Sequence, residues 1–219
     1  MIGFYNYTVI LTYVSLLISA VGIGLAASDR PYAALFCLLA SGICDMFDGK
    51  IARTRKQSTE EEKRFGIQID SLCDVICFGV LPAAVGISLA ASAAPLDRTV
   101  VWCLGGMYIL FALIRLAYFN VTEETRQSTE GGRRTHYQGV PVTTSAVVFP
   151  LVFAVSEILT SMGGFWSHIA PWLYPLFLLI TAVSFITPAK VRKPYGARLV
   201  VLSVIGLLEL ALMVVLLVV

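Results

Sequence analysis

The sequence predicts an all-α, polytopic membrane protein. Of its 219 residues, 58% are hydrophobic and only 14% are charged. Soluble domains carry about 25% charged residues, so too little polar surface remains here to cover a globule in water. Long apolar stretches follow one another along the chain, and the length fits a single domain, 1–219. A net charge of +2 provides no basic excess, so we expect no nucleic acid partner.

Seven stretches are long enough to cross a bilayer as helices, which takes about 20 mostly apolar residues. In chain order they are 7–28, 32–53, 66–94, 99–120, 140–162, 170–187 and 198–219. The first has no basic region before it and no small-residue cleavage site, so we expect a retained helix rather than a signal peptide. The second is the least apolar because it continues through Asp45 and Asp48, which predicts a polar face on that helix.

Short polar segments separate the spans and determine their expected orientation. All but two of the 16 lysines and arginines lie in or beside 54–65, 121–139 and 188–197, and the exceptions are Arg30 and Arg98. Basic residues in short loops mark the cytoplasmic side of a membrane. We therefore expect a cytoplasmic N-terminus and an odd number of spans.

Four aspartates lie within the second and third spans. Asp45 and Asp48 are three residues apart and Asp70 and Asp74 are four apart, so each pair shares one helix face. Asp48 and Asp70 each lie about five residues from the cytoplasmic end of a span, which is roughly 7–8 Å deep. The two helices are joined by a short segment, so the four carboxylates can converge at one level, open to the cytosol.

Four carboxylates so close together need cations. Oxygen ligands suit Mg²⁺ or Mn²⁺, and two such ions about 3.5–4 Å apart typically serve phosphoryl chemistry. Purely structural ion pairs are one alternative, but the basic residues at this depth are few: Lys50, Arg53 and Arg115. A divalent-cation transporter is another, but towards the opposite face the helices offer only Glu157 and Glu209.

Eight residues form the pattern D-x2-D-G-x2-A-R followed by G-x3-D-x3-D. They are Asp45, Asp48, Gly49, Ala52, Arg53, Gly66, Asp70 and Asp74. This pattern resembles the signature of the CDP-alcohol phosphatidyltransferases. The resemblance implies a six-helix core plus one further helix, and an enzyme that transfers a phosphatidyl group from CDP-diacylglycerol to an alcohol and releases CMP.

The resemblance also implies roles for these residues. Asp45, Asp48 and Asp70 would hold two divalent metals, and Asp74 would be the general base and could also touch a metal. The CDP site would be lined by Gly49, Ala52, Arg53 and Gly66. The segment between Arg53 and Gly66 is longer than the family usually has. Because Ser58 and Glu61 have capping-box spacing, we expect the insertion to extend the third helix into the cytosol.

Two further segments bear on the acceptor. Arg115–Asn120, R-L-A-Y-F-N, and Gly139–Thr144, G-V-P-V-T-T, resemble the bacterial phosphatidylserine synthase branch of the family, with Tyr118 as a departure from its pattern. This implies L-serine as acceptor. Arg115 would pair with its carboxylate or with a lipid phosphate, and the side chains that would orient the acceptor are Asn120, Thr143 and Thr144.

Other interpretations of these acceptor residues stay open. Arg115 could extend to the membrane surface without a ligand, and the two threonines could serve helix packing. Glycerol 3-phosphate or inositol phosphate is an alternative acceptor, although a phosphate-bearing acceptor would favour more arginines in the site. We make no assignment for Glu157, Glu209 or the 121–138 loop.

The remaining expectations concern the surroundings of the protein. The five cysteines lie in apolar stretches without a C-x-x-C pair, so we expect reduced core side chains. Reduced cysteines and chemistry facing the cytosol favour a bacterial plasma membrane, with an ER-like membrane as the alternative. The expected partners are CDP-diacylglycerol, L-serine and membrane lipids. An exposed last helix could also support a homodimer.

Overall fold

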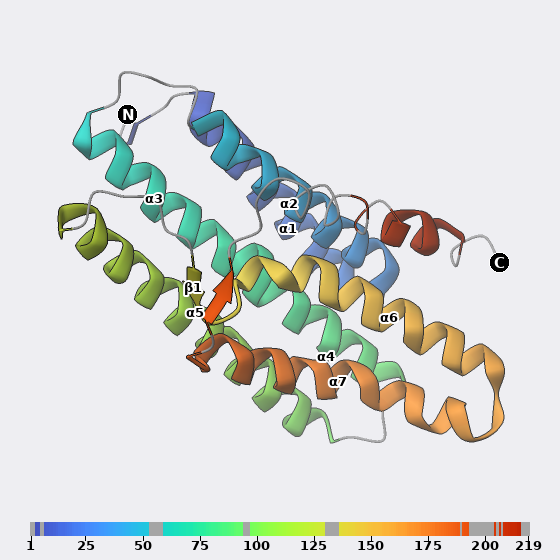
Figure 1. Ribbon diagram of the computed structural model, residues 1–219. Coiled ribbons are helices and arrows are strands. Elements are labelled where there is room, and N and C mark those ends of the chain that lie inside the picture. The colour runs from blue at the N-terminus through green and yellow to red at the C-terminus, as the bar shows by residue number, and fades with distance from the viewer. Residues whose placement is uncertain are drawn as a thin grey trace.

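Long helices form a bundle in the computed structural model of the chain (Figure 1), which describes residues 3–4, 7–52, 59–93, 97–129, 136–188, 190–192, 204, 206 and 208–215. The helices are α1 (Ile10–Ala27), α2 (Pro31–Ala52), α3 (Glu60–Asp74), α4 (Leu81–Ala93), α5 (Arg98–Thr129), α6 (Ser145–Met162) and α7 (Gly164–Ile186). Shorter elements are the 3-10 turns η1 (Tyr7–Val9) and η3 (Val142–Thr144), the π-helical segment η2 (Val75–Val80), and the strands β1 (His136–Gln138) and β2 (Lys190–Arg192). The two strands pair antiparallel.

Six helices in the described part of the chain are long and apolar enough to cross a membrane. They correspond to the first six predicted spans, and α3, η2 and α4 together form the third. The polytopic helical fold is therefore confirmed. The predicted seventh span, 198–219, lies mostly outside the described residues, although 208–215 is helical and Met213 is buried in the core.

Several predicted boundaries are wrong in detail. α5 continues to Thr129, so the first half of the predicted 121–138 loop is helical. The hydroxyls of Thr122 and Thr125 bond to carbonyls of the preceding turn, so these polar residues are accommodated within the helix. α7 begins at Gly164 rather than at 170, directly after a turn in which Gly163 has a φ of 68°.

The insertion before Gly66 extends α3, as predicted, but the cap differs by one residue. Thr59 is the N-cap, its hydroxyl accepts from the amide of Glu62, and the Glu62 carboxylate accepts from the amide of Thr59. Ser58 lies outside the described residues, and Glu61 takes no part in the capping box. Both spacings fit the sequence pattern, and only the structure distinguishes them.

Small residues let the helices that carry the site pack closely. A Cβ atom on Gly22 of α1 would lie 2.8 Å from the Cβ of Cys37 on α2, and one on Gly42 of α2 would lie 2.6 Å from the Cβ of Ala146 on α6. No real Cβ atoms approach so closely, so both positions require glycine. Gly42 lies one turn before Asp45, so the close contact between α2 and α6 helps to determine the position of that aspartate.

The cysteines of the described chain are all free, in agreement with the expectation of reduced side chains. Cys73 and Cys77 are buried, whereas Cys103 is exposed on α5. The expectation of a core position was therefore wrong for Cys103. This part of α5 faces the outside of the bundle, where an apolar side chain can contact lipid.

Candidate active site

Three of the four aspartates converge between α2 and α3. One carboxylate oxygen from each of Asp45, Asp70 and Asp74 lies within 4.8 Å of the others. Asp70 and Asp74 share a face because they are one helical turn apart, and the antiparallel course of α2 brings Asp45 opposite them. The end of the bundle that contains these residues is called the aspartate end below.

Asp48 lies next to this group. Its carboxyl lies beside that of Asp70, and the hydroxyl of Thr12 on α1 donates to its Oδ2 at 3.3 Å. Asp48 is only 8% exposed. All four aspartates predicted from the sequence are thus brought together. Thr12 of α1, which belongs to no recognised sequence motif, contributes a hydrogen-bond donor.

The donor set fits a hard divalent cation. It consists of carboxylate oxygens, which Mg²⁺ and Mn²⁺ prefer, and its members come close enough to share an ion. The salt bridges seen in the described part of the chain are Lys63–Glu60 at 2.7 Å and Arg64–Glu124 at 3.4 Å. Both lie on the exposed ends of α3 and α5, away from the aspartates.

Open space lies beside two of the predicted CDP-binding residues. A Cβ added to Gly49 or to Gly66 would meet no atom of the described residues within 4 Å, so these residues leave room for ligand atoms to approach both backbones. Ala52 is the last residue of α2. Arg53 lies outside the described residues, so its predicted contact with CDP is not placed.

Asn120, a predicted acceptor residue, pairs with Ser71 directly after Asp70. Its amide nitrogen donates to the Ser71 hydroxyl at 2.9 Å, and its carbonyl oxygen lies 3.1 Å from the same hydroxyl. This pair ties α5 to α3 at the level of the aspartates. The two helices run in opposite directions, so residues before Asn120 and residues after Ser71 both lie farther from the aspartate end. Arg115 is five residues before Asn120 and Asp74 is three residues after Ser71, so Arg115 lies about 3 Å farther from that end than Asp74.

Arg115 is buried and bonded to the segment before α6. Its Nε donates to the carbonyl of Val140 at 3.2 Å, its Nη2 lies 3.5 Å from the carbonyl of Gly139, and its guanidinium lies 5.6 Å from the centre of the Phe119 ring. With 6% exposure it does not extend to the surface, so the alternative of a snorkelling side chain is wrong. Gly139 has a φ of 82°, and a Cβ there would lie 3.2 Å from Nε.

The two threonines after this segment differ in their surroundings. The Thr144 hydroxyl donates to the carbonyl of Pro141 at 2.6 Å and so closes the turn of η3. Thr143 is half-buried in the same turn. The structure brings both residues to the start of α6, and the Thr144 contact is a local one typical of a helix start.

Three features around the aspartates were not predicted from the sequence. They are the Thr12 hydroxyl, the Ser71 hydroxyl and the π-helical segment η2 that follows Asp74. Serine and threonine are too common in membrane helices to be selected by type alone. The π-helical turn had a signal, because Pro82 lies four residues after Phe78 and cannot donate a hydrogen bond to its carbonyl.

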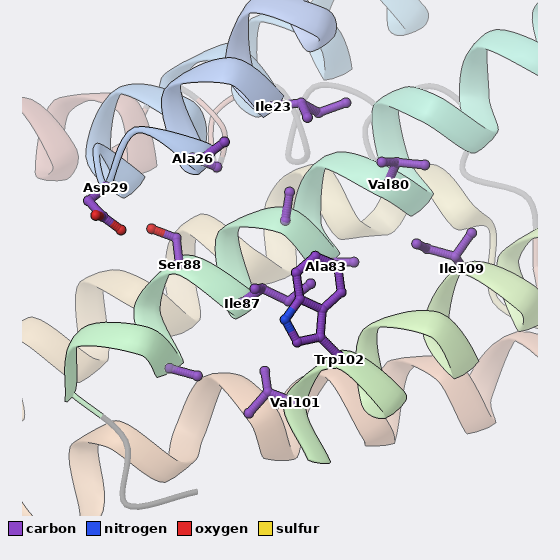
Figure 2. A pocket seen from close by; sticks show the side chains of 13 residues that line it. Ile23, Ala26, Asp29, Val80, Ala83, Ile87, Ser88, Val101, Trp102 and Ile109 are labelled. Atoms are coloured by element: carbon purple, nitrogen blue, oxygen red, sulfur yellow. The ribbon is translucent and has the colours of Figure 1, made fainter. Parts of the chain in front are cut away.

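A separate pocket of about 480 Å³ lies between α1, α4 and α5 (Figure 2). Apolar side chains such as Ile23, Val80 and Ile109 line it, and Asp29 and Ser88 lie near one end. Its lining on α1 is near the end of that helix, whereas Thr12 at the aspartates is near the start. The pocket therefore belongs to the opposite part of the bundle from the aspartate end.

Membrane-type helices around a cluster of carboxylates on α2 and α3 define a polytopic membrane protein whose carboxylates could hold a metal ion. The family model described as CDP-alcohol phosphatidyltransferase matches residues 5–219. The chain belongs to this family, as its aspartate pattern predicted.

Curated relatives carry related names. The chain is 33% identical over 128 residues to CDP-diacylglycerol–serine O-phosphatidyltransferase of Saccharomyces cerevisiae, covering 57% of this chain and 42% of the relative. It is 27% identical to the Mycobacterium leprae protein of that name, covering 84% and 57%. It is 31% identical to archaetidylserine synthase of Methanothermobacter thermautotrophicus, covering 74% and 58%. The chain thus spans about half the length of these relatives.

Proposed function

We propose that this chain is an enzyme that transfers the phosphatidyl group of CDP-diacylglycerol to the hydroxyl of L-serine, giving phosphatidylserine and CMP. The observation that carries the proposal is the convergence of Asp45, Asp70 and Asp74, with Asp48 beside them, in a chain of the CDP-alcohol phosphatidyltransferase family. A cluster of carboxylates at one end of a membrane bundle suits a reaction on a charged diphosphate. Two relatives named for serine transfer and one named for archaetidylserine synthesis support serine as the acceptor.

The four aspartates would hold two divalent ions, Mg²⁺ or Mn²⁺. Bound there, such ions supply positive charge that stabilises the diphosphate as the bond to CMP breaks. Asp45, Asp70 and Asp74 have oxygens close enough to share one ion. Asp48, in contact with Asp70, would join them in holding the second.

Asp74 would act as general base. A serine hydroxyl is a poor nucleophile until its proton is removed. The hydroxyl oxygen would attack the lipid-bearing phosphorus, the bond between that phosphorus and the CMP oxygen would break, and the proton would pass to the Asp74 carboxylate. Asp74 is the deeper of the two aspartates on α3, one turn beyond Asp70, which suits a base beside the lipid side of the diphosphate.

The nucleotide would lie over Gly49 and Gly66, where the backbones are open to approach. Ala52 and Arg53 would extend this surface. Arg115 would hold the 139–140 segment in place for the acceptor, and Asn120 with Thr143 and Thr144 would line the same side. A zwitterionic acceptor such as serine needs few cationic partners, which suits a site with one buried arginine in the described part of the chain.

The aspartate end would face the cytosol of a bacterial plasma membrane, with the N-terminus on that side. The basic residues gather at this end in the sequence. A donor lipid could then keep its tails in the bilayer while serine arrives from water. A homodimer is compatible with the exposed apolar faces of the bundle.

The test is CMP release by purified protein with CDP-diacylglycerol and Mn²⁺, with L-serine, glycerol 3-phosphate and inositol phosphate compared as acceptors. Serine-dependent release is the expected result. Release with a phosphate-bearing acceptor instead would keep the family chemistry and overturn the choice of serine. Metal binding without CMP release for any acceptor would contradict the proposed activity and would favour a cation-transport role instead.

A further inference from the structure

The helix that carries Asp70 and Asp74 widens directly after Asp74. In η2 the amide of Leu81 bonds to the carbonyl of Ile76, five residues back, as in a π-helix. The cause lies in the sequence, because Pro82 has no N–H to offer the carbonyl of Phe78, four residues before it. A widened turn thus leaves the Phe78 carbonyl in need of another donor.

Side chains from two other helices supply that donor. The hydroxyl of Tyr108 on α5 donates to the Phe78 carbonyl at 2.7 Å. The Ser145 hydroxyl, at the start of α6, lies 3.2 Å from the same carbonyl and 2.6 Å from that of Val142, so its single proton is shared. Tyr108 and Ser145 are both fully buried. Tyr108 is therefore the main donor to the widened turn.

The packing of α3 makes this contact important for the aspartates. Among the 15 residues of α3, Cys73 is the buried one, whereas η2 buries Cys77, Phe78 and Gly79. Apart from the Ser71–Asn120 bond and the contact of Phe65 with Phe4, α3 has few contacts of its own, so its direction depends strongly on η2. The ring of Tyr108 is held in turn by edge-on contact with Phe149, with ring centres 5.5 Å apart.

We propose that Tyr108 is a positioning residue for the aspartate cluster: through the Phe78 carbonyl it fixes the widened turn of η2 and thereby the direction of Asp70 and Asp74. The inference rests on the proposed function, because it takes the aspartates to be metal ligands. Groups that orient ligands without touching the metal commonly change metal affinity by 10–100-fold when removed, as an order of magnitude.

The structure offers a matched control in Tyr174. Its hydroxyl, also buried, donates to the carbonyl of Pro82 at 3.1 Å, one turn further from Asp74. Tyr108→Phe and Tyr174→Phe each remove one buried hydroxyl bonded to a carbonyl of the same continuous helix. If the hydroxyls only stabilise the fold, the two substitutions will affect thermal stability and metal binding alike.

The experiment measures Mn²⁺ affinity by electron paramagnetic resonance on the full chain in detergent, without substrates. We expect Tyr108→Phe to weaken Mn²⁺ binding on the order of tenfold and Tyr174→Phe to leave it unchanged, with similar losses in Tm. Equal effects of the two variants on Mn²⁺ affinity, or none, would overturn the inference.

A second variant covers the case in which Tyr108→Phe does not fold. Ser145→Ala removes the partial donor, and we expect a smaller loss of Mn²⁺ affinity in the same direction; an unchanged affinity would overturn the inference. The wild-type protein separates this proposal from the function on which it rests. A wild type that binds no Mn²⁺ refutes the metal site itself, whereas a wild type that binds Mn²⁺ with unaffected variants refutes only the role of Tyr108.

Discussion

The hydroxyl of Thr12 on α1 donates a hydrogen bond to the carboxylate of Asp48 on α2, with 3.3 Å between the two oxygens. Further along the same interface, Ser19 and Ser41 share a hydrogen bond at 2.7 Å, and the Ser15 hydroxyl donates to the carbonyl of Ser41 at 3.3 Å. A row of buried hydroxyls thus fixes α2 against α1. Although α1 carries no residue of the aspartate pattern, it helps to place Asp48.

The Thr12 contact predicts a loss of metal affinity on its removal. Thr12→Val keeps the shape of the side chain but leaves Asp48 without this donor, so we expect Mn²⁺ binding to weaken on the order of tenfold. Thr12→Ser keeps the hydroxyl and should bind Mn²⁺ like the wild type. Isothermal titration of the three proteins with Mn²⁺ checks this, and equal affinities for Thr12→Val and Thr12→Ser would show that the hydroxyl is not needed.

The open space at Gly49 and Gly66 predicts an effect on nucleotide binding alone. Within the part of the chain that the structure describes, a methyl group at either position meets no atom within 4 Å, so Gly49→Ala and Gly66→Ala should fold normally. If the nucleotide packs against these backbones, each change should weaken CDP binding by about tenfold or more, because the methyl group occupies ligand space.

The matched control for these glycines is Gly106→Ala on the outer face of α5, where the added methyl group also meets no described atom within 4 Å. It should leave CDP binding unchanged. Equilibrium binding of labelled CDP measures all three variants. Wild-type affinity in both Gly49→Ala and Gly66→Ala would remove these residues from the nucleotide site.

Arg115 predicts a selective effect on the acceptor. Arg115→Ala removes buried, charge-assisted hydrogen bonds to the 139–140 segment, and such bonds contribute about 1.5–3 kcal/mol. We expect the KM for L-serine to rise roughly 10–100-fold while CDP affinity stays close to wild type. Arg115→Lys keeps the charge but not the planar fork, so it should recover activity only in part. Steady-state kinetics over a serine series tests this, and an unchanged KM in Arg115→Ala would exclude the role.

A hydrogen bond remote from the site predicts a stability effect without an activity effect. The Tyr32 hydroxyl on α2 donates to the Glu157 carboxylate on α6 at 2.6 Å, and the Tyr32 ring packs edge-on against Phe153. Tyr32→Phe should cost about 1–3 kcal/mol, since it leaves a carboxylate without this donor at membrane depth. Glu157→Gln keeps an accepting oxygen and should cost less.

Thermal unfolding in detergent measures this difference, together with turnover below the transition. A lower Tm with normal turnover is the expected result for Tyr32→Phe. A loss of turnover at an unchanged Tm would mean that this pair takes part in the reaction. The same contact gives Glu157 a structural partner, which the sequence could not assign.

The fold and the central aspartates were predictable because their signals are local. Apolar runs of about 20 residues specify membrane helices, and the spacings of Asp45 to Asp48 and Asp70 to Asp74 specify one face of each helix. The short connection between α2 and α3 then leaves little freedom in how these faces meet. The observed convergence of Asp45, Asp70 and Asp74 follows from these three constraints.

The supporting contacts were not predictable because they join residues far apart in the chain. Thr12 meets Asp48, Asn120 meets Ser71, and Tyr108 meets the carbonyl of Phe78 only once the helices are packed. The N-cap of α3 is Thr59 rather than the predicted Ser58, because both hydroxyl residues have a glutamate three residues later and so satisfy the capping-box pattern. The inward direction of the Arg115 side chain likewise depends on Gly139, because the positive φ of this glycine sets the position of the carbonyl that Arg115 contacts.

The most direct test of the account is the transfer of labelled L-serine into lipid by wild type and by Asp74→Asn, with CDP-diacylglycerol, in the presence and absence of Mn²⁺. We predict metal-dependent transfer by wild type, with one CMP released for each lipid formed. We also predict a loss of about 10²-fold or more in Asp74→Asn, with CDP still bound. Transfer by Asp74→Asn at the wild-type rate, or transfer that persists after EDTA, would contradict these predictions.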